Sequence, residues 1–389
     1  MSRALAHVEL VSSVEPIEGA DRIECVSVLG WKVVQQKGTV NVGDKVVYIE
    51  IDSKVPATDT FEFLENRGYK VKTIKLRGCI SQGLIMTFDS LNLNPNKYNV
   101  GDDLTKQLGI TKIETDEEKR LKRSEGMDSA IVSMKARHKK IFSKPFIKKM
   151  MKYSWFRRVM FFIFGKKKDK PKSFPGFIKK TDEIRVENIP EVIGQKKRYW
   201  VTEKIDGTSS TYAVEKKGRK YEFIVCSRNV RQQDVDQKCY HDCGNVYWEM
   251  AYKYSIKDFL IYFAIKTNSE VVILQGETYG ESLQGNPYKL NYRYFAGFNL
   301  ILTDKRNSFY KRYSPEEGRD ICNKNDIPWV PILGTSEEFP DNIEDFKKLA
   351  EGKSVINKDV LREGLVYRGV DDDFSFKNVS NTYLLKHNG

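Results

Sequence analysis

Short apolar runs separated by glycine-containing turns dominate the first 105 residues, and they limit this region to a β-rich fold. In the run GDKVVYIEID (43–52), valine, tyrosine and isoleucine alternate in part with polar residues, as in a strand with one buried face. Glycines such as Gly38 and Gly78 mark the turns between such runs. Many short strands at close spacing predict a small barrel.

We interpret residues 1–105 as an OB-like barrel, and a small SH3-like barrel has much the same pattern. Residues 181–389 predict a larger domain of mixed α and β structure, because strand-like runs such as RYWVTE and EVVILQGETYG alternate with helix-like stretches such as KDFLIYFAIKT. The expected fold class is therefore α+β, with a basic helical segment and linker at residues 106–180 between the two domains.

The positive charge of the chain is concentrated in one block. The whole sequence carries a formal net charge of +13. Residues 135–180 hold 17 Lys or Arg against the single acid Asp169, which is a net +16, so the remaining chain is close to −3. A local basic block of this kind suits a polyanionic partner.

Within that block, residues 146–164 have apolar side chains at roughly helical spacing, which predicts one amphipathic helix with lysines and arginines on its other face. Three interpretations compete for this helix. It packs on a neighbouring domain, its basic face meets nucleic-acid phosphate, or it lies on a membrane surface. The pattern alone does not separate the three.

Lys204 is the candidate nucleophile. It follows the alternating run YWVTE and precedes Ile205, Asp206 and Gly207, a pattern that predicts a β-hairpin with Lys204 near its bend. A solvated lysine has a pKa of about 10.4, so only roughly 0.1% is a free amine near neutral pH, a handicap of roughly 4 kcal/mol. Burial or a nearby metal ion lowers that pKa and activates the amine.

Acidic and basic residues at strand ends complete a candidate phosphate-transfer site. Glu277 follows an apolar strand and Glu363 precedes one, and with Asp206 they offer the hard oxygen ligands that Mg²⁺ or Mn²⁺ prefers. A phosphate chain also needs fixed positive charges. The candidates are Arg185, Arg228, Lys377 and Lys386. No GxxxxGK[ST] sequence is present, which excludes a P-loop.

Six short stretches in order resemble the motifs of the covalent nucleotidyltransferases, the superfamily of ATP-dependent ligases and mRNA capping guanylyltransferases. These are KIDG (204–207), SRN (227–229), GE (276–277), YRYFAGFNL (292–300), EGLVYR (363–368) and SFKNVSNTYLLK (375–386). The last two resemble RNA ligases more than DNA ligases. The first domain, with GDKVVYIEIDSKVP and TIKLRGCISQGL, resembles the N-terminal OB domain of RNA ligase family five.

The resemblance implies an ATP-grasp-like nucleotidyltransferase domain at 181–389 and a role for each candidate. Lys204 would take AMP from ATP as a phosphoramidate, and the AMP would pass to an RNA 5′-phosphate before a 3′-hydroxyl displaces it. Asp206, Glu277 and Glu363 would hold Mg²⁺ or Mn²⁺, and Phe298 (or else Phe295) would stack on adenine. The other expected nucleotide contacts are Glu203, Arg185, Arg228, Glu277, Lys377 and Lys386.

Two positions depart from the family pattern. Ser209 stands where some RNA ligases carry an essential asparagine, and Val379, not a second lysine, stands two places after Lys377. The expected activity is ATP-dependent sealing of RNA ends, at nicks in duplexes, as in RNA repair. The alternatives are an ATP-dependent DNA ligase, a capping enzyme, or a nucleic-acid-binding protein with a decayed ligase domain. Both of the first two usually carry an OB domain after the catalytic domain.

The expected partner is RNA or an RNA-containing duplex, with no obligate protein partner and no stable membrane association. The N-terminus lacks the long apolar run of a signal peptide, and no segment has the ~18–20 apolar residues of a membrane span. Six scattered cysteines fit free thiols, and the cluster of Cys239, His241 and Cys243 lacks zinc spacing. We therefore expect the cytoplasm or another reducing intracellular compartment.

Overall fold

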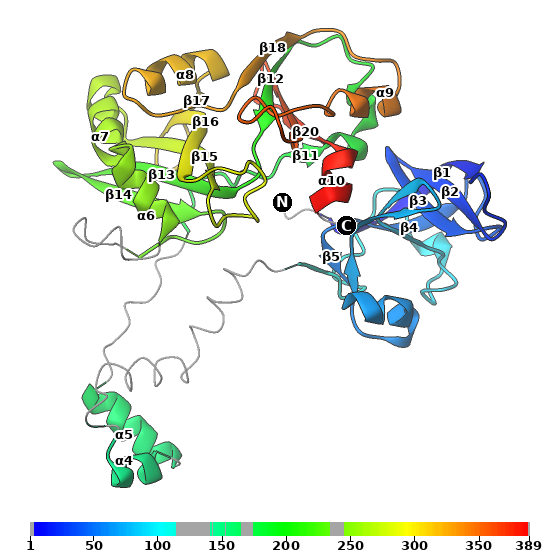
Figure 1. Ribbon diagram of the computed structural model, residues 1–389, viewed down its shortest axis with the longest axis horizontal. Coiled ribbons are helices and arrows are strands. Elements are labelled where there is room, and N and C mark those ends of the chain that lie inside the picture. Colours follow the sequence, from blue (N-terminus) through cyan, green and yellow to red (C-terminus); the bar gives the residue numbers. More distant parts are fainter. Residues whose placement is uncertain are drawn as a thin grey trace.

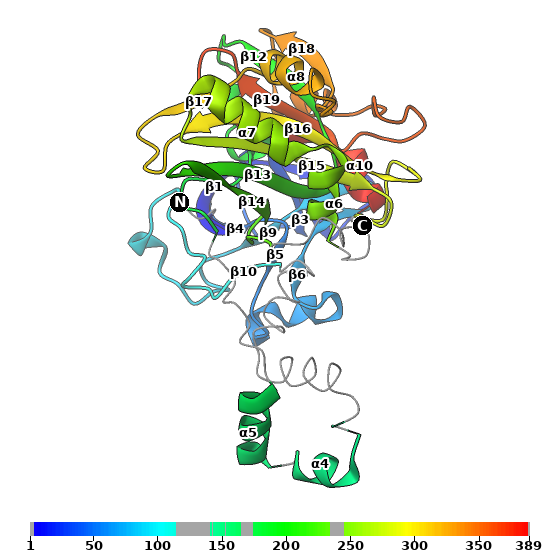
Figure 2. The same ribbon diagram turned by 90° about the vertical axis from the view of Figure 1, so that its left-hand side faces the viewer.

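The chain forms a small β-rich domain, a larger mixed domain and a pair of helices that lies apart from both in two perpendicular views (Figures 1 and 2). The structure is a computed structural model that describes residues 4–113, 141, 143–151, 153–164, 174–233 and 245–387. The cluster of Cys239, His241 and Cys243 lies outside the described residues, as does most of the predicted linker after residue 164.

A five-stranded antiparallel sheet forms the centre of the small domain, in the order β3-β2-β1-β4-β9. The long strand β1 (Ala6–Pro16) pairs with β4 (Lys45–Ile49) along its first half and with β2 (Ile23–Val28) along its second. A register shift between Val11 and Ser13 separates the two halves. Such a bulge bends a strand, so one strand serves two parts of a curled sheet.

Short strands and 3₁₀ helices complete the small domain. Val47 and Ile49 lie in one of its two hydrophobic cores and Tyr48 in the other, because successive side chains of a strand point to opposite faces. The sheet therefore has an apolar core on each of its two faces. Its remaining elements are β3 (Trp31–Gln36), β5 (Ser53–Lys54), η1 (Asp59–Arg67), β6 (Lys70–Val71), β7 (Thr73–Leu76), β8 (Cys79–Gln82), β9 (Leu84–Met86), η2 (Pro95–Lys97) and β10 (Thr111–Lys112).

The basic segment contains two short helices, α4 (Pro145–Met150) and α5 (Ser154–Phe164), so the prediction of one continuous helix over 146–164 is wrong. The chain turns at Met151, whose amide still bonds to the carbonyl of Ile147. The turn brings Met151 and Met160 together as a small buried core. Packing between the two halves outweighs the continuous periodicity of the sequence.

Two five-stranded sheets form the large domain, in the orders β14-β13-β15-β16-β17 and β11-β20-β19-β12-β18. All pairs are antiparallel except β11 with β20. The strands are β11 (Ile184–Arg185), β12 (Tyr199–Lys204), β13 (Thr208–Lys217), β14 (Lys220–Ser227), β15 (Val271–Gly280), β16 (Arg293–Thr303), β17 (Tyr310–Arg312), β18 (Ile332–Ser336), β19 (Gly364–Gly369) and β20 (Ser375–Val379).

Helices cover the first of these sheets on one face, where Phe259, Leu260 and Phe263 pack against Val272 and Leu274. Figure 2 shows α7 lying across the strands. The helices of the large domain are η3 (Val186–Asn188), η4 (Pro190–Val192), α6 (Val246–Lys253), α7 (Ile256–Thr267), α8 (Pro315–Asn323), α9 (Ile343–Lys348) and α10 (Asn381–His387).

The residues after Lys204 carry the chain from one sheet to the other. β12 pairs with β18 and β19, whereas β13 pairs with β14 and β15, so the predicted hairpin between β12 and β13 is wrong. Apolar alternation marks a strand but does not identify its partner. Gly207 lies in this crossing, and a Cβ there would be 2.3 Å from the carbonyl oxygen of Thr278. The close approach explains the glycine.

Direct contacts join the two domains. The amide of Gly30 donates to the carbonyl of Glu187 at 2.9 Å. Trp31 donates through Nε1 to Asn188 at 2.5 Å, and Asn188 in turn donates to Glu50 at 2.6 Å. A Cβ on Gly30 would lie 2.8 Å from the Cα of Glu187, so this position accepts only glycine at the observed spacing.

Helix α9 extends the same interface. Lys347 Nζ lies 3.0 Å from Glu187 Oε1 and 2.9 Å from Gln82 Oε1, so it joins both domains. Lys32 forms an ion pair with Glu344, again across the interface. These contacts hold the small domain against the larger one and place the β5-β6-β10 sheet beside the cavity described next.

Candidate active site

A cavity of about 750 Å³ lies between the two domains. Strands β12, β13, β15, β16, β19 and β20 supply its walls from the large domain, and Lys70 and Lys72 line it from the small domain. Its volume is within the usual range of about 300–1,000 Å³ for small-molecule sites. The predicted residues Lys204, Glu277, Phe298 and Lys377 line the cavity, and Glu277 lies within β15, not after the strand as the sequence predicts.

Lys204, the last residue of β12, lies among carboxylates. Its Nζ is 2.6 Å from Glu363 Oε2, and a quarter of its side chain is exposed. Burial alone would lower the pKa of Lys204, but the charges of Glu363, Glu277 and Asp206 outweigh it and raise that pKa. The expected activation by burial is therefore not present, and the resting side chain is an ammonium ion.

The pKa values of the neighbouring acids are also raised, which disfavours their charged form. Burial, and then the charge of Glu363, raise the pKa of Asp206 to about 6. Burial also raises the pKa of Glu277 to about 8, against the opposing pull of Lys204. Tyr383 donates to Asp206 Oδ2 at 2.7 Å and so fixes that carboxylate. The acids are too poorly solvated to carry their full negative charge without a further cation.

The carboxylates suit a divalent metal ion by their chemistry. Hard oxygen donors are the preferred ligands of Mg²⁺ and Mn²⁺, and the pKa values of Asp206 and Glu277 are raised mainly by burial, to which the charges of neighbouring acids add. Within the described ranges, no three His, Cys, Asp or Glu side chains already form a metal-binding group. The site therefore fits a metal that also takes ligands from a bound phosphate or water.

Phe298 and Tyr247 are aromatic side chains on the cavity wall, and Phe298 is the one that the sequence predicts to stack on adenine. The guanidinium of Arg368 lies 5.5 Å from the ring centroid of Phe298. Phe295, the alternative for stacking on adenine, is fully buried in the core of the large domain. Glu203 also borders the cavity, but its carboxylate accepts from Ser354 and from the amide of Val355, so it anchors that loop.

Asp182 links three cations at the edge of the cavity. Its carboxylate lies 2.7 Å from Arg228 Nη2, 3.4 Å from Lys377 Nζ and 3.6 Å from Lys112 Nζ. Arg228 and Lys377 were predicted, but Asp182 was not, because an isolated acid before a short strand gives no signal in sequence. The two predicted cations are thus held in place beside the site by a shared counter-ion.

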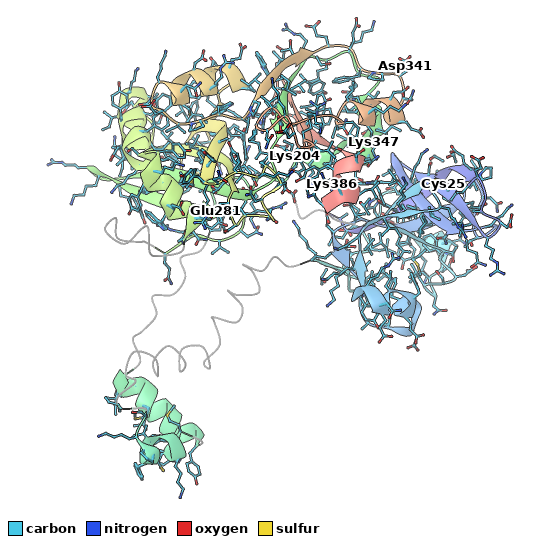
Figure 3. All side chains as sticks on the ribbon, viewed as in Figure 1. Cys25, Lys204, Glu281, Asp341, Lys347 and Lys386 are labelled. Carbon is cyan, nitrogen blue, oxygen red and sulfur yellow. The ribbon has the colours of Figure 1, made fainter. Side chains whose placement is uncertain are left out.

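Four of the predicted residues do not line the cavity: Asp206, Glu363, Arg185 and Lys386. Arg185 is 6% exposed at the domain interface, where Nη2 lies 3.7 Å from Asp52 and the guanidinium lies over Trp31. Its Nε and Nη1 have no hydrogen-bond partner among the described residues. Lys386 is exposed near the end of α10, beside the small domain, whereas Lys204 lies inside the larger one (Figure 3).

Sequence reasoning also missed Lys70 and Lys72. They alternate around Val71, which is buried in the core of the small domain, so both lysines point the other way, toward the cavity. Lys-Val-Lys alternation is the only signal in the sequence, and it does not show which domain the lysines face.

The large domain holds an amine among acids beside an interdomain cavity, and a small β-barrel precedes this domain in the chain. This arrangement defines a nucleotidyltransferase of the polynucleotide-ligase type. The comparisons with known proteins give the family. The family model described as RNA ligase matches residues 197–380, and one described as an OB-fold domain matches residues 5–88. None of the curated proteins compared matches the chain.

Solved structures of an RNA ligase from Naegleria gruberi align over the whole length. The structure with pyrophosphate is 30% identical with a TM-score of 0.73, covering 100% of this chain and 99% of that one. A lysine variant of that ligase with ATP and manganese is 30% identical with a TM-score of 0.73, covering 99% of each chain. The chain belongs to the RNA ligase family. The predicted fold, an OB barrel followed by a ligase domain, is confirmed.

Proposed function

We propose that the chain is an ATP-dependent RNA ligase that joins a 3′-hydroxyl to a 5′-phosphate in three steps. Lys204 Nζ attacks the α-phosphorus of ATP, a P–N bond forms, and the bond to the bridging oxygen breaks to release pyrophosphate. The RNA 5′-phosphate then takes AMP from Lys204. Attack by the 3′-hydroxyl forms the phosphodiester and releases AMP. The position of Lys204 Nζ, 2.6 Å from Glu363 in the cavity, is the observation that carries this proposal.

Lys204 must lose a proton before it attacks, and the acids around it oppose that loss. Asp206, Glu277 and Glu363 would hold a divalent cation, Mg²⁺ or Mn²⁺, whose charge lowers the pKa of the amine and stabilises negative charge on the α-phosphate. Tyr383 keeps Asp206 aimed at that position through its 2.7 Å hydrogen bond. The Naegleria ligase variants contain manganese with ATP or AMP, which supports the same requirement here.

The cavity offers a place for each part of ATP. Phe298 would stack on adenine, and Lys377 would neutralise the α-phosphate once ATP competes with Asp182 for it. Arg228, which shares the same counter-ion, would contact the ribose or the RNA 5′-phosphate. Arg185 would reach the leaving pyrophosphate through its unpartnered donors only if its side chain turns from the interface.

Lys386 is the weakest of the proposed contacts. It lies on α10 beside the small domain, away from the residues that line the cavity, so it would need to approach the site from there (Figure 3). Lys70 and Lys72 already line the cavity and supply positive charge there. We therefore assign them to the phosphate chain in the same proposal.

RNA is the proposed substrate, and a nick in a duplex is the proposed form of its ends. The test is sealing of a nicked duplex whose 3′-hydroxyl strand ends in ribonucleotides or in deoxyribonucleotides, with ATP and Mg²⁺. Wild type and Lys204→Ala are compared. We expect sealing only with the ribonucleotide end, and none with Lys204→Ala. Equal sealing of both ends would indicate a DNA or general ligase, and failure to form a labelled protein–AMP adduct would indicate a decayed domain.

A further inference from the structure

Helices α4 and α5 form a small unit with a core of its own. Met151 and Met160 are buried at 7% and 6% exposure, and the partly buried side chains against them are those of Ile141, Ile147 and Phe156. All members of this cluster come from the same segment of the chain. The two helices thus bury the apolar side chains of their inner faces against each other.

The outer face of α5 is apolar and exposed. Trp155, Val159, Phe162 and Ile163 are exposed by 58, 44, 90 and 61%. Their spacing of i, i+4, i+7 and i+8 puts them on one side of the helix. Phe146 of α4 is also 68% exposed. A contiguous apolar surface of this kind marks a docking site, because scattered single residues would be the norm on a free surface.

The charge of the segment and the length of its helices limit the kinds of partner that this face can bind. Neither helix contains an acid, and residues 135–180 hold 17 Lys or Arg against one Asp. With 11 residues, α5 is roughly 16 Å long at 1.5 Å per residue, well short of the ~30 Å core of a bilayer. None of the described helices is long and apolar enough to cross a membrane. These features favour a partner that is both anionic and apolar.

We propose that α4 and α5 bind reversibly to the surface of a membrane that carries anionic headgroups. Trp155, Phe162 and Ile163 enter the boundary between headgroups and acyl chains, and the surrounding lysines and arginines meet the headgroup charge. An RNA partner would account for fewer of the exposed apolar side chains, since Val159 and Ile163 have neither a charge to bind phosphate nor a ring to stack on bases. Such binding is reversible and differs from the stable membrane association that the sequence analysis does not expect.

The test uses the full-length protein and sedimentation with two kinds of vesicle, phosphatidylcholine alone and phosphatidylcholine with phosphatidylserine. The double variant Phe162→Ser/Ile163→Ser removes exposed side chains only, so the small core stays intact. Phe63→Ser is the matched control, because Phe63 is a 59% exposed phenylalanine on the small domain. Protein–AMP formation is measured for each protein and should stay unchanged, which shows that the variants are folded.

We expect binding to the anionic vesicles that weakens with salt, and about a tenfold or greater loss in the double variant but not in Phe63→Ser. Tryptophan fluorescence should shift to the blue on binding through Trp155, since Trp31, Trp248 and Trp329 are buried in the folded domains and Trp200 is partly buried there. No vesicle binding, or equal binding by the double variant, would overturn the proposal. Loss of RNA binding or of self-association in the double variant, without vesicle binding, would overturn it in favour of those partners.

Discussion

Lys204 Nζ and Glu363 Oε2 lie 2.6 Å apart, and this contact favours the protonated, unreactive form of the proposed nucleophile. Glu363 contributes the largest opposing charge to the raised pKa of Lys204. The same carboxylate is a proposed metal ligand. Binding of a cation would therefore withdraw the partner that stabilises the ammonium, so metal binding and activation of the amine are coupled.

Glu363→Gln should separate these two effects. The maximal rate of protein–AMP formation should fall on the order of 100-fold, because a metal ligand and its electrostatic stabilisation are lost. The pH at which the rate is half-maximal should nevertheless move to lower values, since the pKa of Lys204 is no longer raised by Glu363. Rates measured from pH 6 to 10 with labelled ATP provide the check. A lower rate with an unchanged midpoint would contradict the coupling.

Glu277 and Asp206 predict how the stability of the metal-free protein depends on pH. Their folded-state pKa values, about 8 and about 6, lie above the ordinary values, so their contribution is complete below the ordinary values. It is lost as pH rises through the folded values. Thermal unfolding should therefore show falling stability between about pH 5 and pH 8.

The same measurement on Glu277→Gln should show a shallower fall, because one of the two titrating groups is gone. Mg²⁺ or Mn²⁺ added at pH 8 should restore stability in the wild type more than at pH 5, since metal competes with protons for the carboxylates. Identical pH profiles for wild type and Glu277→Gln would show that the carboxylate is better solvated than its burial indicates.

Phe298→Ala should raise KM for ATP with a smaller change in the rate of adenylyl transfer at saturation. Stacking on an aromatic ring contributes about 1–3 kcal/mol per base, which corresponds to an increase of roughly 5- to 150-fold. Phe309→Ala is the control, because Phe309 is a 51% exposed phenylalanine of the same domain that does not line the cavity. Equal KM values for Phe298→Ala and the control would place adenine elsewhere.

The sequence predicts several residues that the structure brings together, but not the full set. Lys204, Asp206 and Glu363 belong to short local patterns, and the structure places them at the end of β12, in the crossing after it and just before β19. Lys70 and Asp182 escape such reasoning, because their role depends on how distant segments meet in space. Periodicity locates the strand before Lys204 but not the strands that pair with it. Periodicity also does not show the turn that divides residues 146–164 into two helices, because that turn depends on packing between the two halves.

Lys70→Ala/Lys72→Ala should lower protein–AMP formation by about tenfold, because two cations beside the phosphate chain are lost. Neither lysine forms an ion pair with a described residue, so the loss is not one of stability. Lys75→Ala, an exposed lysine of the same domain, is the control. Joining of RNA that already carries a 5′-adenylate shows whether the lysines contact the phosphates of ATP or the RNA end. It should stay normal if the lysines act on ATP, and it should fall if they hold the RNA end.

Gly30→Ala tests whether the small domain must be docked for the first step. Its Cβ would meet the Cα of Glu187 at 2.8 Å, so the interface has to open by several tenths of an ångström or more. That shift weakens the Trp31–Asn188 hydrogen bond and moves Lys70 away from the cavity. Gly194→Ala is the control, since nothing lies within 4 Å of a Cβ there. We expect a reduced rate of protein–AMP formation in Gly30→Ala alone, with both proteins folded by circular dichroism. A normal rate in Gly30→Ala, with the interface opened in scattering measurements, would show that the large domain transfers AMP without its partner.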